Sequence, residues 1–140
     1  MGKYAVVYWS GTGNTEAMAE EIAEGIRAAG KQAELFTAAE FSDGQVAEYD
    51  GIAFGCPSMG AEELESEEFA PMFEAVLPLL KEKKVALFGS YGWGDGEWMR
   101  NWQADIAEDC QLVADGLIAN EAPDEEAKAE CRALGAQLAS

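Results

Sequence analysis

Stretches of consecutive apolar residues alternate along this chain with stretches in which apolar residues recur every three or four positions. Residues 4–9, Tyr-Ala-Val-Val-Tyr-Trp, form an unbroken apolar run of the kind found in a strand buried on both faces. Residues 14–29 follow, with Met18, Ile22 and Ile26 at helical spacing and glutamates on the opposite face. The pattern therefore predicts a buried strand followed by an amphipathic helix.

The same alternation continues to the end of the chain. We expect further strands at residues 33–37, 52–54, 85–88 and 112–119, and further helices at residues 67–80, 97–108 and 124–138. Strands that alternate with helices build a parallel sheet with helices on both faces. Because crossovers are right-handed, we expect a three-layer α/β sandwich whose five parallel strands lie in the order 2-1-3-4-5. Residues 1–140 fit a single domain of this kind.

Charge and composition exclude several classes of partner and binding site. A net charge of −18, from 27 acidic and 9 basic residues, argues against nucleic acid or anionic membrane as a partner, because both are bound through Lys and Arg. No apolar run approaches the ~20 residues of a membrane span, and the N-terminus does not resemble a signal peptide, so we expect a cytoplasmic protein. The chain lacks histidine and has three cysteines, Cys56, Cys110 and Cys131. We expect buried thiols rather than a zinc site or disulfide framework.

The residues that could bind a ligand lie directly after the first, third and fourth predicted strands. The ends of these strands meet at the ligand-binding edge of such a sheet. The first loop, residues 10–15, is Ser-Gly-Thr-Gly-Asn-Thr, which places hydroxyls and backbone N–H groups at a positive helix end. It lacks the lysine of a nucleoside-triphosphate loop, and Glu16 stands where a dinucleotide fingerprint needs glycine. A monophosphate held without a basic residue fits best. The alternative is a glycine-rich turn without a ligand.

The second and third loops carry aromatic and sulfur side chains. Residues 55–62 are Gly-Cys-Pro-Ser-Met-Gly-Ala-Glu, and residues 89–98 are Gly-Ser-Tyr-Gly-Trp-Gly-Asp-Gly-Glu-Trp. An aromatic ring on a glycine-rich loop is costly to expose, so Trp93 is a candidate stacking surface. Met59 could contact the other face of a flat ring, although methionine ordinarily fills gaps in a core. For Trp98, on the following helix, we expect core packing.

Together, residues 9–16, 55–60 and 89–94 resemble the three binding loops of the flavodoxin family. The resemblance covers the whole chain, with the loops in the right order and at the right spacing. The last strand carries no long insertion, so the chain is similar to the short-chain flavodoxins of anaerobic bacteria. Flavodoxins are themselves a standard example of the strand order 2-1-3-4-5 and of FMN bound where strands 1 and 3 part. The resemblance therefore implies a flavodoxin-like fold with bound FMN.

The resemblance also implies roles for individual residues. The first loop would hold the FMN phosphate, Trp93 would stack on one face of the isoalloxazine ring, and Met59 would lie against the other. Glu62 would accept a hydrogen bond from flavin N3, and the carbonyl of Gly60 would accept one from N5 when that atom is protonated. The residues expected to bind the cofactor are Ser10, Gly11, Thr12, Gly13, Asn14, Thr15, Ser58, Met59, Gly60, Ala61, Glu62, Ser90, Tyr91, Gly92, Trp93 and Gly94.

The implied function is electron transfer, without a substrate of the protein's own. In this family FMN shuttles one electron between a neutral semiquinone and an anionic hydroquinone, and an apolar slot with nearby acids lowers the potential of that step. Glu62, Glu63, Glu65, Glu67 and Glu68 suit either a solvated helix start or a rim around the exposed flavin edge. Such a rim would guide basic-surfaced redox enzymes into transient complexes, and we expect the carrier to be a monomer.

Two other functions stay open at this point. An FMN-dependent quinone or nitro-reductase would need a site for NAD(P)H. The chain has only nine basic residues and no obvious extra loop over the flavin, which argues against such a site. Steady NADH consumption by the pure protein would favour it. A receiver-type signalling domain would need paired acids after the first strand and an aspartate after the third, where Ser10 and Cys56 stand instead. A colourless pure protein would favour that alternative.

Overall fold

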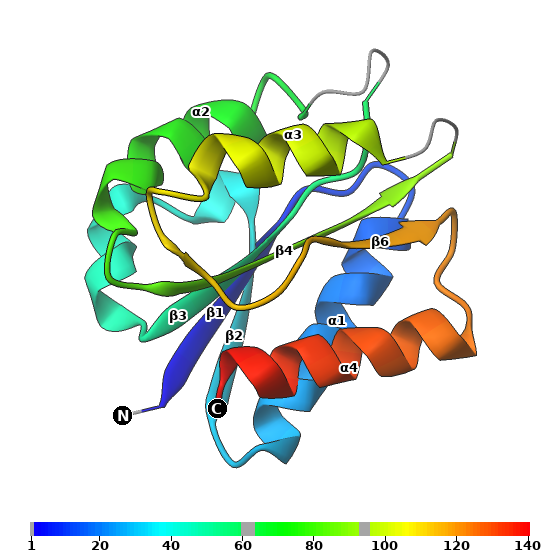
Figure 1. Cartoon of the computed structure of the whole chain (residues 1–140), viewed down its shortest axis with the longest axis horizontal. Coiled ribbons are helices and arrows are strands. Elements are labelled where there is room, and N and C mark those ends of the chain that lie inside the picture. The colour runs from blue at the N-terminus through cyan, green and yellow to red at the C-terminus, as the bar shows by residue number, and fades with distance from the viewer. Residues whose placement is uncertain (1, 60–63, 93–95) are drawn as a thin grey trace.

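The computed structural model of the chain describes residues 2–59, 64–92 and 96–140. Its parallel sheet has the order β2-β1-β3-β4-β5, and β6 also pairs with β4 (Figure 1). The strands are β1 (Lys3–Tyr8), β2 (Gln32–Thr37), β3 (Gly51–Gly55), β4 (Lys84–Tyr91), β5 (Gln111–Leu112) and β6 (Leu117–Asn120). The α-helices are α1 (Asn14–Ala28), α2 (Phe69–Val76), α3 (Glu97–Ile106) and α4 (Glu125–Leu138). The predicted fold class and strand order are confirmed.

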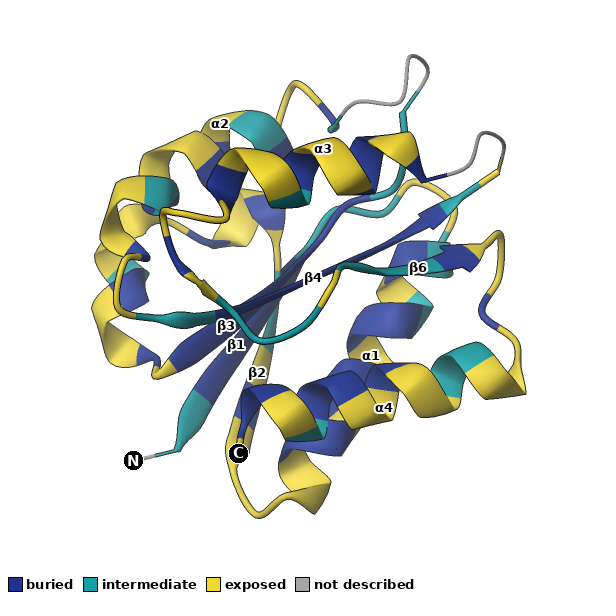
Figure 2. Cartoon of the chain, in the orientation of Figure 1, coloured by how far each residue is buried: buried dark blue, intermediate teal, exposed yellow. Residues whose placement is uncertain are grey.

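Helices cover both faces of this sheet, α2 and α3 on one face and α1 and α4 on the other (Figure 1). Alternate residues of a strand point to opposite faces. Ala5 and Val7 of β1 therefore join the core beneath α2 and α3, whereas Tyr4 and Val6 join the core beneath α1 and α4. Figure 2 shows the central strands buried and the helices exposing their outer faces. Burial on both faces explains why the strands are unbroken apolar runs in the sequence.

The fifth strand is divided, which differs from the uninterrupted strand predicted at residues 112–119. Both pieces, β5 and β6, run parallel to β4. Between them the N–H of Gly116 donates to Gln103 Oε1 on α3 at 2.7 Å. A Cβ at Gly116 would lie 2.4 Å from Met99 Sδ, so the backbone approaches α3 as closely as only glycine allows. This approach to α3 interrupts the pairing with β4.

In the described part of the chain, three short 3₁₀ helices complete the face that carries α2. They are η1 (Ala38–Glu40), η2 (Asp43–Glu48) and η3 (Leu77–Leu79). The predicted helix at residues 67–80 is shorter than expected, because α2 ends at Val76 and η3 replaces its last turn. Pro78 lies in that turn and lacks the N–H that a continuing α-helix would use.

On the other face, α1 and α4 pack backbone to backbone through two glycines. A Cβ at Gly25 would lie 2.0 Å from the carbonyl oxygen of Arg132, and one at Gly135 would lie 2.1 Å from that of Ile22. Real side chains cannot approach a carbonyl this closely. The absence of side chains at these two positions therefore sets the distance between the helices.

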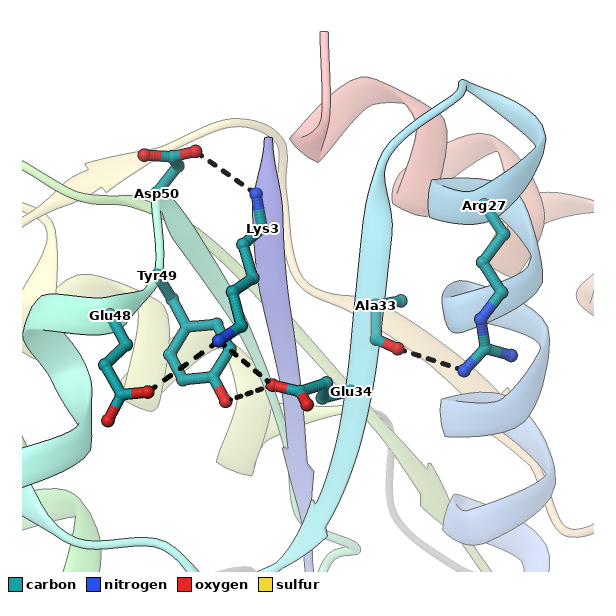
Figure 3. A network of polar contacts seen from close by, with 7 residues as sticks. All are labelled: Lys3, Arg27, Ala33, Glu34, Glu48, Tyr49 and Asp50. Carbon is teal, nitrogen blue, oxygen red and sulfur yellow. Dashed lines mark hydrogen bonds and ion pairs between the residues drawn. The ribbon is translucent and has the colours of Figure 1, made fainter. Parts of the chain in front are cut away.

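A polar network fixes the amino-terminal ends of the strands (Figure 3). Asp50 Oδ2 accepts a hydrogen bond from the backbone N–H of Lys3 at 3.2 Å. Tyr49 donates its hydroxyl to Glu34 Oε1 at 2.5 Å, and Lys3 Nζ lies 3.7 Å from the carboxylates of Glu34 and Glu48. These groups lie at the end of the sheet opposite the three predicted loops, so the network serves the fold.

All three cysteines are buried and unpaired, as the sequence predicted. Within residues 2–59, 64–92 and 96–140, no helix combines the length and apolar character needed to cross a bilayer.

Candidate functional site

Four segments that are distant in sequence surround a hollow of about 270 Å³ at the carboxyl-terminal edge of the sheet. They come from the carboxyl-terminal end of β4 and from the segments that follow β1, β3, β4 and β6 along the chain. The described residues that line the hollow are Thr12, Asn14, Pro57, Ser58, Ser90, Tyr91, Gly92 and Glu121. The structure therefore brings parts of all three predicted loops together and adds a fourth segment.

The first loop is organised from within by the hydroxyl of Ser10. Its Oγ accepts hydrogen bonds from the backbone N–H groups of Gly13 at 3.0 Å and Glu16 at 3.3 Å. Gly13 precedes α1 with φ 95°, a conformation that glycine adopts without strain. The loop thus turns directly into the amino-terminal end of α1, where the helix dipole favours an anion. Gly11 is exposed in the same loop.

Ser90 connects the loops to one another. Its backbone N–H donates to Thr15 Oγ1 at 3.3 Å, its carbonyl accepts from the N–H of Ser58 at 3.0 Å, and its hydroxyl donates to the carbonyl of Glu121 at 2.7 Å. Thr15 and Ser90 are almost completely buried. Both residues therefore hold the walls of the hollow together, and their direct contact with FMN stays a prediction.

Glu121 was missed by sequence reasoning. It has φ 56°, the single positive value among the described non-glycine residues, and its N–H donates to the carbonyl of Tyr91 at 2.8 Å. The sequence did contain a signal that could have placed Glu121 at the site. Glu121 follows the fifth predicted strand, and the ends of parallel strands share one edge of the sheet. Pro123, two residues later, also marks a turn there.

The acidic run after the second loop is not uniformly solvated. The carboxylate of Glu65 is buried and accepts hydrogen bonds from the backbone N–H groups of Glu67, Glu68 and Phe69, at 3.0, 2.8 and 2.8 Å. Burial alone would raise the pKa of Glu65, but these three bonds outweigh it and hold the pKa below its ordinary value. Glu65 caps the start of α2, so its inclusion in an exposed rim is wrong. Glu67 and Glu68 are exposed.

Cys56 and Trp98 form a buried support beneath the second loop. Trp98 is 2% exposed and its Nε1 donates to the carbonyl of Cys56 at 3.2 Å, which confirms the core packing predicted for this tryptophan. Burial raises the pKa of the Cys56 thiol to about 12, so the thiol is protonated at neutral pH. A protonated, buried thiol is a poor nucleophile.

Part of the predicted site lies outside the described residues, namely Gly60, Ala61, Glu62, Trp93 and Gly94. The roles expected of these residues toward the isoalloxazine ring stay predictions. Met59, one residue beyond Ser58, is half-buried.

The donors around the hollow fit the phosphate and hydroxyls of a mononucleotide. Thr12, Asn14 and Ser58 offer two hydroxyls and a carboxamide, whereas the Ser90 hydroxyl already donates to Glu121, and the α1 terminus adds a positive dipole. Among the described lining residues there is no lysine or arginine. An anion would therefore be held by hydrogen bonds and the helix dipole.

Comparison with known proteins agrees with this arrangement. The flavodoxin family model matches residues 6–135. The chain is 48% identical over 130 residues to the flavodoxin of Megasphaera elsdenii, covering 93% of each chain. It is 43% identical over 136 residues to the flavodoxin of Clostridium beijerinckii, covering 96% of this chain and 98% of that one. The solution structure of two-electron reduced Megasphaera elsdenii flavodoxin superposes with a TM-score of 0.87 at 45% identity, covering 97% and 98% of the two chains.

Proposed function

The chain belongs to the flavodoxin family, and we propose that it is a low-potential, one-electron carrier with no substrate of its own. Members of this family bind FMN and transfer electrons, so the cofactor and the general activity follow from membership. The proposal adds the redox steps, the binding residues and the kind of partner. We also propose that residues 1–140 form one FMN-binding domain.

The observation that carries the proposal is the hollow at the strand ends. Thr12 and Asn14 stand at the start of α1 and would donate to the phosphate, together with backbone N–H groups of the same loop other than that of Gly13, which donates to Ser10. Ser58 and Tyr91 come from the neighbouring strand ends. Ser10, Thr15 and Ser90 hold these segments in place through the hydrogen bonds described above. Contacts of this kind would fix the position of the cofactor relative to the sheet.

Bound FMN supplies the electron chemistry, which we propose is a cycle between its neutral semiquinone and anionic hydroquinone. The chain's contribution is to make additional negative charge unfavourable at the site. Glu121 lines the hollow, and the protein as a whole carries a net charge of −18. A buried anion gains less from solvation than one in water and is repelled by these charges. Both effects lower the potential at which the last electron is accepted.

The acidic surface also supports the proposed partners. Glu67 and Glu68 are exposed at the start of α2, beside the second loop. A field of this sign speeds encounter with basic-surfaced redox enzymes. We propose transient complexes of a monomeric carrier with such enzymes. The three buried, unpaired thiols are compatible with the reducing cytoplasm, where we propose that it acts.

Titration of the apoprotein with FMN tests the cofactor assignment. One FMN should bind per chain, with a shift of the flavin absorbance bands and quenching of flavin fluorescence. Free riboflavin lacks the phosphate, so it should bind more weakly. The difference in binding free energy is the contribution of the first loop. Equal affinity for the two flavins would contradict the proposed phosphate site, and steady NADH oxidation by the loaded protein would favour a reductase.

A further inference from the structure

Trp9 lies at the exit from β1 and contacts three parts of the molecule at once. Its backbone N–H donates to the carbonyl of Gly55 at 3.0 Å, which extends the pairing of β1 with β3. Its ring packs against the core beneath α2 and α3. The ring also lies over the phosphate loop, because a Cβ at Gly11 would be only 3.2 Å from its Cη2 atom. The indole therefore borders the loop that takes the FMN phosphate.

The indole nitrogen of Trp9, the only polar atom of this ring, is hydrogen-bonded to a residue at the start of α2, which follows the second loop. Trp9 Nε1 donates to Glu68 Oε1 at 3.0 Å, across 59 residues of sequence. Glu68 is itself held, because its backbone N–H donates to the buried carboxylate of Glu65 at 2.8 Å. Glu65 in turn donates its backbone N–H to Cys56 Sγ at 3.3 Å. The main chain of Glu68 is thus held at the start of α2, and its exposed carboxylate accepts from Trp9.

We propose that Trp9 is a positioning residue for the cofactor phosphate. The hydrogen bond to Glu68 fixes the orientation of the indole, and the indole limits the positions that Gly11 and the rest of residues 10–13 can occupy. A loop that is already in its binding conformation loses less entropy when the phosphate binds. The inference rests on the proposed FMN function. It implies that the contribution of the phosphate to FMN affinity depends on the Trp9–Glu68 hydrogen bond, which lies outside the phosphate site.

The test compares FMN with riboflavin on the same apoproteins by isothermal titration calorimetry. Trp9→Phe keeps an aromatic ring but removes the donor, and it should raise the Kd for FMN about three- to tenfold, the effect of one hydrogen bond. The Kd for riboflavin should stay within about twofold of wild type, because riboflavin does not use the phosphate loop. Glu68→Ala breaks the same bond from its exposed partner and should reproduce the result if the Trp9 variant folds poorly.

Glu68→Gln separates the bond from the charge. Its amide oxygen can still accept from Trp9, so the FMN affinity should not fall although the negative charge of Glu68 is lost. Tyr49→Phe is the matched control, because it removes another aromatic-to-glutamate bond at the opposite end of β3, about 16 Å away along a five-residue strand. It should leave the affinity for both flavins unchanged.

Four results would overturn the inference alone. They are an unchanged FMN affinity in Trp9→Phe, an equal loss for FMN and riboflavin, a loss in Glu68→Gln as large as in Glu68→Ala, and a selective loss of FMN affinity in Tyr49→Phe. If the wild-type apoprotein binds neither flavin, the proposed function fails, and this inference fails with it. The two kinds of failure are therefore distinguishable in one set of titrations.

Discussion

The hydroxyl of Ser90 donates to the main-chain carbonyl of Glu121 at 2.7 Å and joins the end of β4 to the turn after β6. Glu121 has φ 56°, a left-handed conformation that costs a non-glycine residue roughly 1–2 kcal/mol. A second bond, from the N–H of Glu121 to the carbonyl of Tyr91, holds the same turn. The fourth wall of the hollow is thus strained locally and held by bonds to β4.

Ser90→Ala should lower the free energy of unfolding by about 1–2 kcal/mol, because it leaves the carbonyl of a strained residue without its hydroxyl partner. Urea denaturation of the apoprotein would measure the change. Ser66→Ala is the control, since Ser66 is exposed at the start of α2, and its effect should stay within about 0.5 kcal/mol. Equal stabilities of the two variants would show that the Ser90 bond contributes nothing.

Glu65→Gln tests the buried cap of α2. The variant should lose roughly 1–2 kcal/mol at neutral pH, because the charge that faces three backbone N–H groups disappears. The folded-state pKa of Glu65 lies below its unfolded value of about 4.3, so this stabilisation is complete above that value and is lost as the pH falls through the folded-state pKa. The wild-type protein should therefore lose its advantage over the variant in acid.

Glu67→Gln is the matched control for that experiment, because Glu67 is the exposed glutamate two residues further along. It removes the same charge from the same helix start without removing a cap. Denaturation curves measured from neutral pH to about pH 3 would separate the two variants. A constant difference between wild type and Glu65→Gln across this range would contradict the assigned role.

The outcome for Glu65 shows what the sequence could not reveal. Five glutamates in seven positions look solvated by composition, and the burial of Glu65 depends on the path of the chain around Cys56. The division between β5 and β6 was equally hidden, because it follows from the contact of Gly116 with α3. Such contacts between distant segments leave no local pattern.

The strands and the place of the site, by contrast, could be predicted from local pattern. Burial on both faces requires unbroken apolar runs, so β1 and β4 are visible in the sequence. The order of a parallel sheet then brings the loops after β1, β3 and β4 to one edge. Thr12, Ser58 and Tyr91 indeed line one hollow. Glu121 follows from the same rule, once it is applied to the last strand as well.

Gly25→Ala should destabilise the protein by about 2–4 kcal/mol, since the new methyl group would collide with the carbonyl of Arg132 and force α1 and α4 apart. Thermal unfolding by circular dichroism would detect this. Gly44→Ala is a suitable control, because a Cβ at Gly44 meets nothing within 4 Å and its φ is not positive. That change should be neutral or stabilise by up to about 1 kcal/mol. Similar melting temperatures for the two variants would refute the close-packing account.

Thr12→Val should weaken FMN binding about 10- to 100-fold, as expected for the loss of a hydrogen bond to a charged phosphate, and should leave riboflavin binding unchanged. Thr12 is exposed at the mouth of the hollow, so the fold should tolerate the substitution. Thr12→Ser, which keeps the hydroxyl, should bind both flavins nearly as wild type does. A parallel loss in the valine and serine variants would assign the effect to shape rather than to hydrogen bonding.

An anaerobic titration of the FMN-loaded protein with dithionite, followed by absorbance, tests the central claim most directly. We predict two separated one-electron steps, with a blue intermediate that absorbs at long wavelength before the protein bleaches, and a second step at markedly lower potential. Reduction in a single two-electron step, with no long-wavelength absorbance at any point, would contradict the account of this protein as a one-electron carrier.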